Sequence, residues 1–189
     1  SQIESGKNPA SGTVCITFDD GYLDTFTTAA PILEQYHLPA TLYVPTGYIR
    51  RTEMQWADAL YCMFRLRKTC KLRMPMLGLD VDLAVNRDRT LARARLQRVL
   101  LESTYEYRSQ LLSDVKGQLQ PDGPGMRLTM SWDELRELTR RQPGFEIGGH
   151  SRNHIDLATH RGDAVREEIL GCAQDLRQEL GSQPQHFCF

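Results

Sequence analysis

The fold of this chain is decided first by residues 14–21, which have the sequence VCITFDDG. The first five of these residues are apolar or β-branched and predict a short buried strand, and the Asp-Asp-Gly after them predicts a loop. Downstream, Thr27 or Thr28 can cap a helix that has Pro31 in its first turn. Residues 40–44, ATLYV, predict a second strand. A strand, a helix and a strand in this order form a βαβ unit, so we expect an α/β fold with a parallel sheet.

The α/β pattern is interrupted between residues 50 and 127. Apolar residues recur there at helical spacing around Trp56 and Leu96, whereas residues 71–88 contain a proline and a glycine and predict irregular structure. Residues 50–127 hold 15 Lys and Arg against 9 Asp and Glu, a balance of +6, and the rest of the chain has 8 against 15, a balance of −7. We therefore expect a mainly helical insertion within a single domain that spans residues 1–189.

The α/β pattern returns after this segment. Ser131 and Glu134 have the spacing of a capping box at the start of a helix. Residues 145–149, FEIGG, predict a third strand, and residues 163–181 predict a long helix that a glycine closes. Residues 186–189 predict the start of a fourth strand.

The bulk composition is that of an ordinary folded domain. The 189 residues are 40% hydrophobic and 25% charged, which suffices for one domain with a substantial core. No apolar run is long enough to predict a transmembrane span, no block of like charge predicts a nucleic-acid partner, and the first residues lack the apolar core of a signal peptide. The five cysteines are scattered without a CxxC pair, which argues against a zinc knuckle and favours a reducing compartment.

Two polar clusters follow the predicted strands. Asp19 and Asp20 come directly after the first strand, and His150 and His154 come after the third. The carboxyl ends of parallel strands meet at one edge of a sheet, where α/β proteins build their active sites. Histidines at i and i+4 lie on one face of a helical turn, close enough to share a metal ion.

Either cluster alone is weak evidence, because Asp-Asp-Gly after a strand is commonly a turn and a histidine pair is commonly structural. Together, two histidines and one carboxylate form a facial triad that leaves coordination positions open for water and substrate. A second carboxylate beside the first supplies the general base that a hydrolytic metal site needs. The sequence therefore predicts a hydrolytic metal centre.

The neighbours of the histidines have lesser predicted roles. Gly148 and Gly149 are expected to let the backbone come close to the site. Ser151 is expected to be a turn hydroxyl, and Arg152 and Asn153 are expected to be solvated or structural.

An Asp-Asp-Gly after one strand, with a later strand that ends in His-Ser-x-x-His, resembles the polysaccharide deacetylase family, also called the NodB-homology domain or carbohydrate esterase family 4. The likeness covers residues 13–49 and 129–189. The resemblance implies the family's deformed (β/α) barrel. We expect only the first half of that barrel here, with the helical insertion between its second and third strands.

The same resemblance implies roles for the two polar clusters. Asp19 would be the catalytic base, and Asp20, His150 and His154 would hold a divalent metal ion, with Zn²⁺ the expected ion. The reaction would remove acetyl groups from an N-acetylated polysaccharide or oligosaccharide.

The last residues depart from the family pattern. The family's general acid is a histidine in a late motif whose position would lie beyond Phe189, and Cys188 stands where many members have an arginine that orients the base. The resemblance therefore implies a domain truncated at its C-terminus. Two other functions stay open, namely a metal-dependent amidohydrolase acting on another C–N bond, and a catalytically silent domain that binds glycan or serves as a scaffold.

Overall fold

A three-stranded parallel sheet brings the two polar clusters to one of its edges. The computed structural model describes residues 6, 8–51, 53–123, 126–181 and 183–189. The sheet has the order β1-β2-β5, with β1 at Thr17–Phe18, β2 at Ala40–Val44 and β5 at Phe145–Gly149. Phe18 pairs with Leu42, and Val44 pairs with Gly149, so the chain leaves β1 and β5 at the same edge. The predicted α/β fold with a parallel sheet is confirmed.

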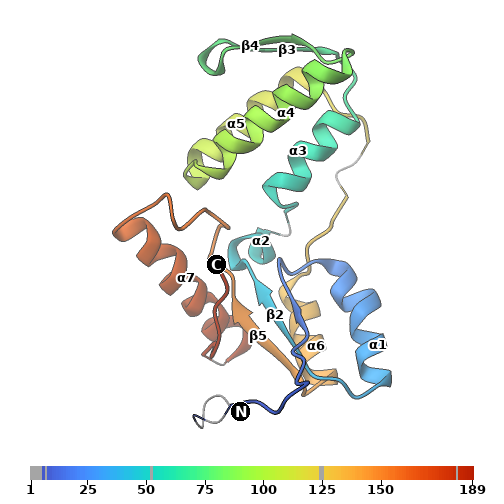
Figure 1. Cartoon of the computed structure of the whole chain (residues 1–189), viewed down its shortest axis with the longest axis vertical. Coiled ribbons are helices and arrows are strands. Elements are labelled where there is room, and N and C mark those ends of the chain that lie inside the picture. Colours follow the sequence, from blue (N-terminus) through green and yellow to red (C-terminus); the bar gives the residue numbers. More distant parts are fainter. Residues whose placement is uncertain (1–5, 7, 52, 124–125, 182) are drawn as a thin grey trace.

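Helices pack against this sheet (Figure 1). They are α1 at Ala30–Gln35, which follows a π-helical turn at Thr25–Ala29, α6 at Trp132–Arg141 and α7 at Asp163–Leu180. Their apolar sides and the strands form one buried cluster, in which Leu42 and Val44 have no exposed surface. The helix α7 ends at Gly181 in the left-handed conformation, with φ of +74°, which is the cap that its glycine predicts.

Two predicted boundaries in the first βαβ unit are wrong. Only Thr17 and Phe18 pair as β1, and Val14 is 82% exposed, although Ile16 still packs against the apolar cluster of the sheet. Residues 23 and 24 are already helical, so the helix does not begin after a cap at Thr27 or Thr28, and the residue before the π-helical turn makes no side-chain capping bond. The Thr27 hydroxyl instead donates to the Leu23 carbonyl at 3.2 Å, within the first turn.

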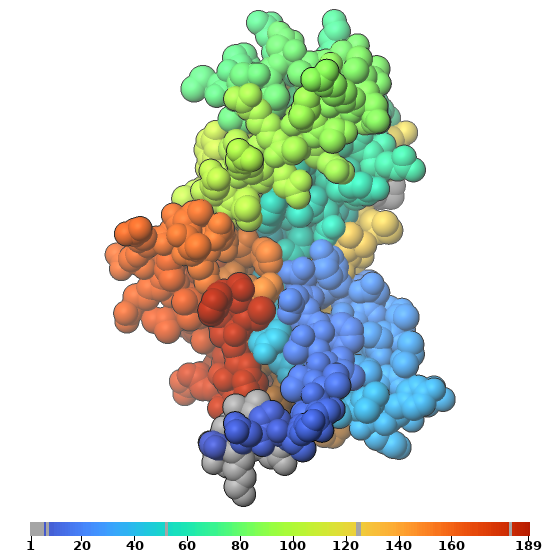
Figure 2. Space-filling view, viewed as in Figure 1, coloured from blue at the N-terminus to red at the C-terminus, as the bar shows by residue number. Residues whose placement is uncertain are grey.

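The chain between α2, at Thr46–Arg51, and α6 builds a second lobe beyond the carboxyl ends of the strands (Figures 1 and 2). Its helices are α3 at Trp56–Arg65, α4 at Asn86–Leu101 and α5 at Tyr105–Leu119, and α2 leads into it from β2. We call residues 55–119 the helical lobe. It has its own buried cluster, centred on Leu96, Leu100 and Val115. In α2, Tyr48 belongs to the cluster of the lobe and Ile49 to that of the sheet, so this short helix joins the two cores.

The prediction of irregular structure over residues 71–88 is wrong. The strands β3, Lys71–Met74, and β4, Leu79–Asp82, form an antiparallel hairpin apart from the parallel sheet. A 3₁₀ turn joins them, and Gly78 closes it in the left-handed conformation, with φ of +59°. Burial alternates along β3, as a half-buried strand requires.

The last residues lie beside β5, where a fourth strand was predicted. Phe187 forms an isolated parallel bridge with Gly149. The N–H of Gly149 donates to the His186 carbonyl at 3.0 Å, and the N–H of Cys188 donates to the Gly149 carbonyl at 2.9 Å. The strands in the described ranges do not close a barrel. None of the helices in those ranges has the length and apolar character needed to cross a membrane.

Glu134 gives α6 a pH-dependent N-terminal cap. It accepts the backbone N–H of Ser131 at 2.7 Å and the guanidinium of Arg127 at 2.7 and 2.8 Å. The Arg127 hydrogen bond is the main reason that the pKa of Glu134 is lowered from 4.5 to about 2. A lowered pKa in the folded state stabilises the protein above pH 4.5, and that stabilisation is lost as the pH falls toward 2.

We expect Glu134→Gln to lower the free energy of unfolding at pH 7 by about 1 kcal/mol, the usual effect of losing a helix cap. The difference from the parent should shrink between pH 5 and pH 3, as measured by urea denaturation. Glu137→Gln is the matched control, since Glu137 makes only an exposed ion pair with Arg140 on the same helix and should change stability by less than about 0.5 kcal/mol. A difference for Glu134→Gln that is independent of pH would contradict this account.

Candidate metal centre

Three side-chain atoms converge at the carboxyl edge of the sheet. The Nε2 atoms of His150 and His154 are 3.2 Å apart, and Oδ1 of Asp20 lies 3.5 Å from the first and 3.1 Å from the second. Two ligands of a tetrahedral zinc ion, each bound at about 2.0–2.1 Å, lie about 3.3 Å apart. The structure thus brings together the three residues predicted as ligands, at a spacing that fits a single divalent ion.

The Asp20 carboxylate supports a cation at this point. Its Oδ1 is buried and has no hydrogen-bond partner among the described residues, whereas buried polar atoms in folded proteins nearly always have one. Burial would raise the pKa of Asp20, but the neighbouring His154 and His150 outweigh it and hold that pKa below its ordinary value. The carboxylate is therefore charged and lacks a partner at its inner oxygen.

The tautomer of His150 strengthens this argument. Nδ1 of His150 lies 3.0 Å from the main-chain carbonyl of Cys188, which can only accept, so Nδ1 carries a proton and in the neutral ring Nε2 is the acceptor. Two acceptors, His150 Nε2 and Asp20 Oδ1, thus face each other at 3.5 Å. His154 has one Nε2 proton at most and cannot satisfy both, so a cation among the three atoms fits the site better than a proton does.

The loop that carries the histidines, residues 150–154, is not the helical turn that the i, i+4 spacing predicted. We call it the histidine loop. Ser151 and His154 have φ of +60° and +52°, a conformation uncommon for residues other than glycine, and Asp20 has φ of +73°. The N–H of His154 donates to the Ser151 hydroxyl at 3.0 Å. The histidines therefore meet through a tight irregular turn, closed by the serine hydroxyl expected there.

Two carboxylates of α7 hold the histidine loop in place through hydrogen bonds. Glu168, 5% exposed, accepts the backbone N–H groups of Arg152 and Asn153 at 2.9 and 2.6 Å and the Asn153 amide at 2.9 Å. Asp175 accepts the Arg152 guanidinium at 2.9 and 3.0 Å and the Thr46 hydroxyl at 2.8 Å. Arg152 and Asn153 are thus structural, one of the two roles expected for them.

Sequence reasoning missed Glu168 and Asp175. Together with the buried Cys172 they occupy positions i, i+4 and i+7 of α7, which is one helical face. Two acidic residues on a buried apolar face need hydrogen-bond or charge partners, so this pattern in the sequence could have indicated that both residues have a structural or functional role. It does not say which part of the chain supplies them.

Glycines around the loop serve packing. A Cβ at Gly148 would lie 2.5 Å from the Tyr43 ring, and one at Gly149 would lie 2.9 Å from the Phe187 ring. These two glycines therefore make room for aromatic rings, and Gly148 also lets the main chain approach, since a Cβ there would lie 3.1 Å from the His186 carbonyl oxygen. Gly47 comes close to the histidine loop as well, since a Cβ there would lie 2.7 Å from a carbonyl oxygen of that loop.

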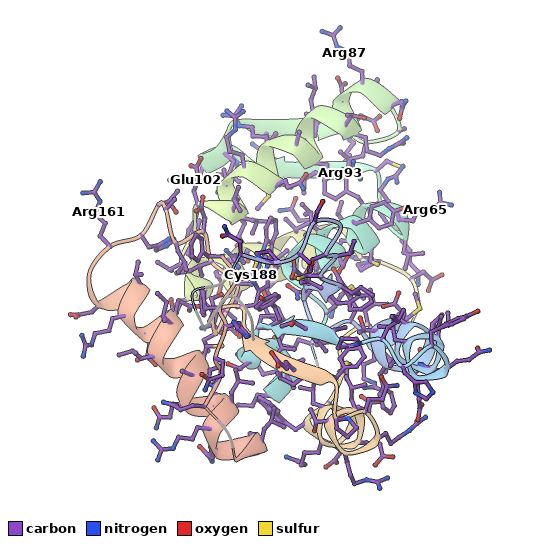
Figure 3. The ribbon with its side chains drawn as sticks, turned by 60° about the horizontal axis from the view of Figure 1, so that its bottom comes forward. Arg65, Arg87, Arg93, Glu102, Arg161 and Cys188 are labelled. Carbon is purple, nitrogen blue, oxygen red and sulfur yellow. The ribbon has the colours of Figure 1, made fainter. Side chains whose placement is uncertain are left out.

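Asp19 lies beside the three converging residues but does not join them. Its side chain is exposed at the end of β1. Burial, and after it the charge of Asp19, raises the pKa of the Cys188 thiol, so the Asp19 carboxylate lies within electrostatic range of Cys188. Figure 3 draws Cys188, which is half-buried, near the ends of the strands, whereas Arg65, Arg87 and Arg161 point outward at the periphery.

A hollow of about 390 Å³ opens beside the two histidines. Cys188 and the apolar side chains of Ile155 and Leu157 line it, and Leu101 reaches it from the end of α4 in the helical lobe. Its volume is in the range of small-molecule pockets. The three converging atoms therefore lie next to a space that can admit part of a substrate.

Comparison with known proteins gives consistent matches. A family model described as polysaccharide deacetylase matches residues 6–189. YxkH from Bacillus subtilis (strain 168), provisionally named a polysaccharide deacetylase, is 45% identical over 42 residues, which are 22% of this chain and 15% of that protein.

Solved structures of deacetylases also resemble the chain, and two of them are compared with it. The Streptococcus pyogenes deacetylase PplD in complex with acetate aligns with a TM-score of 0.53 and 17% identity, over 98% of this chain and 49% of that one. The deacetylase domain of BpsB from Bordetella bronchiseptica aligns with a TM-score of 0.49 and 17% identity, over 98% of this chain and 58% of that one. The chain thus spans about half the length of PplD and shares its fold.

Proposed function

The chain belongs to the polysaccharide deacetylase family, and on that premise we propose that it hydrolyses the N-acetyl groups of an amino-sugar polymer with a divalent metal ion. We assign Asp20, His150 and His154 as the ligands. The observation that carries this proposal is the convergence of their three donor atoms within 3.1–3.5 Å of one another, with Asp20 Oδ1 buried and unpartnered among the described residues. Zn²⁺ is the proposed ion, because two imidazoles and one carboxylate are a donor set typical of catalytic zinc.

The proposed chemistry is amide hydrolysis, which consumes one water and yields acetate and a free amine. The ion supplies Lewis-acid activation to the amide carbonyl and the attacking water. Asp19 is the proposed general base, because its exposed carboxylate makes no hydrogen bond or ion pair with any described residue and is free to take the proton of that water. The Nδ1–H of His150, held by the Cys188 carbonyl, keeps its Nε2 directed at the ion.

The hollow beside the histidines is the proposed place of the acetyl group. Ile155 and Leu157 give it an apolar lining that suits a methyl group. The polymer is assigned only by class, as one that carries N-acetylated amino sugars.

The test combines metal analysis with an assay of acetate release. The protein is stripped with a chelator, reloaded with zinc, and incubated with chitin oligomers, peptidoglycan and an N-acetylated exopolysaccharide. We expect acetate release from at least one polymer after reloading and none before it. Equal release with and without metal would exclude the metal centre. A protein that binds zinc and releases no acetate would be an amidohydrolase if it opens cyclic amides, and a glycan-binding or scaffold domain if it does not.

A further inference from the structure

We infer that the helical lobe is part of the metal centre, because its residues Gln55 and Arg108 hold the backbone of two of the three ligand residues, Asp20 and His154. This inference rests on the proposed metal site. Gln55 and Arg108 are positioning residues, which neither bind the ion nor touch the substrate. The inference also gives the segment between β2 and β5 a function beyond packing.

The first contact fixes Asp20. Gln55, the residue that precedes α3, is 3% exposed, and its Nε2 donates to the main-chain carbonyl of Asp20 at 3.0 Å. Asp20 has φ of +73°, so its peptide groups adopt an orientation that an ordinary aspartate avoids. A buried donor on the Asp20 carbonyl stabilises that orientation and, with it, the direction of the carboxylate.

The second contact fixes His154. Arg108 on α5 is 1% exposed, and its Nη1 donates to the carbonyls of Asn153 and His154 at 3.1 and 3.0 Å. Its Nε donates to the Leu100 carbonyl at 2.9 Å, which ties the guanidinium to the end of α4. A planar guanidinium can hold both sides at once because its nitrogens are fixed relative to one another, whereas a lysine ammonium is a single donor point.

Trp56 joins the two contacts. It follows Gln55 directly, is 6% exposed, and its ring centroid lies 5.0 Å from the Arg108 guanidinium carbon, in the range of a cation–π contact. Among the described residues, the partners of the Arg108 guanidinium are main-chain carbonyls, the Trp56 ring and the buried Tyr48 side chain, whose pKa Arg108 lowers against the effect of burial. A buried guanidinium needs such partners to offset its desolvation. The pair therefore forms one rigid unit against both ligand-bearing loops.

The experiment measures zinc affinity and ligand geometry in the full chain, without recourse to activity. The variants are Arg108→Lys, which keeps the charge and loses the two-sided contact, and Gln55→Met, which keeps the length and loses the donor. Arg87→Lys is the control, because Arg87 lies in the same lobe and points to solvent (Figure 3). Zinc dissociation constants are measured by competition with a chelator, and the visible absorption of bound Co²⁺ reports the ligand geometry.

We expect each variant to bind zinc about 10–100-fold more weakly than the parent, the usual effect of losing a partner that orients a ligand, and to change the Co²⁺ spectrum. Arg87→Lys should match the parent in both. If one variant does not fold, the other decides. Parental affinity and spectrum in a folded variant would overturn the inference alone. If the parent bound no zinc, the proposed metal site would fall and this inference with it.

Discussion

Replacing His154 with alanine is expected to abolish zinc binding and deacetylation while the fold persists. The side chain of His154 is one-third exposed and belongs to neither buried apolar cluster, so its loss removes little packing. Two ligands remain of the three that hold the ion. Lewis-acid activation by a metal is worth several kcal/mol of barrier, and about 1.4 kcal/mol is a factor of ten, so acetate release should fall at least about a thousandfold.

Stability measurements separate this effect from misfolding. Without metal, His154→Ala should still unfold cooperatively but with a free energy of unfolding below that of the parent, because the change removes the histidine that faces the Asp20 carboxylate at 3.1 Å and lowers its pKa. Added zinc should stabilise the parent by about 2.7 kcal/mol at a hundred times the dissociation constant and should not stabilise the variant. His37→Ala is the matched control, since His37 is exposed, has the same φ of +52° as His154 and does not belong to the group of converging ligand atoms. A His154→Ala protein that still binds one zinc ion tightly would exclude His154 as a ligand.

The convergence of Asp20, His150 and His154 was predictable because it depends on topology more than on local detail. The strands β2 and β5 have strong apolar signals, Ser131 and Glu134 form the predicted capping box, and parallel pairing then places the loops at one edge. The same signals could not give the conformation of the histidine loop, because the enrichment of Asn, Asp and His among left-handed residues is too weak to assign that conformation to a given position.

The residues that support the site from the helical lobe could not be predicted from the sequence, for a different reason. Arg108 and His154 are 46 positions apart, and their contact depends on how the helical lobe sits on the sheet. No periodicity encodes such a contact. The β3–β4 hairpin was missed because its strands are four residues each and the proline and glycine of the turn dominate the local pattern.

Asp19→Asn is expected to lose catalysis and keep the metal. Asparagine has nearly the same shape but cannot accept a proton from water, and general base catalysis contributes about 10²–10⁴-fold. The kcat for amide hydrolysis should fall by that factor, and the zinc dissociation constant should stay at the parental value, because Asp19 does not belong to the group of converging ligand atoms. Asp24→Asn is the control. Asp24 is exposed on the same segment and makes no capping bond, so its change should leave both quantities unaltered.

The adjacent substitution Asp20→Asn makes the assignment testable in both directions. Asp20 Oδ1 is buried between the two histidines, so the Asp20→Asn protein should lose zinc affinity and activity together. The Asp19→Asn protein should lose activity alone. Zinc titration and acetate release, measured on both proteins, therefore give two different patterns from neighbouring carboxylates. If Asp19→Asn lost zinc and Asp20→Asn retained it, the two roles would be exchanged. If both kept parental activity, neither carboxylate would take part in the reaction.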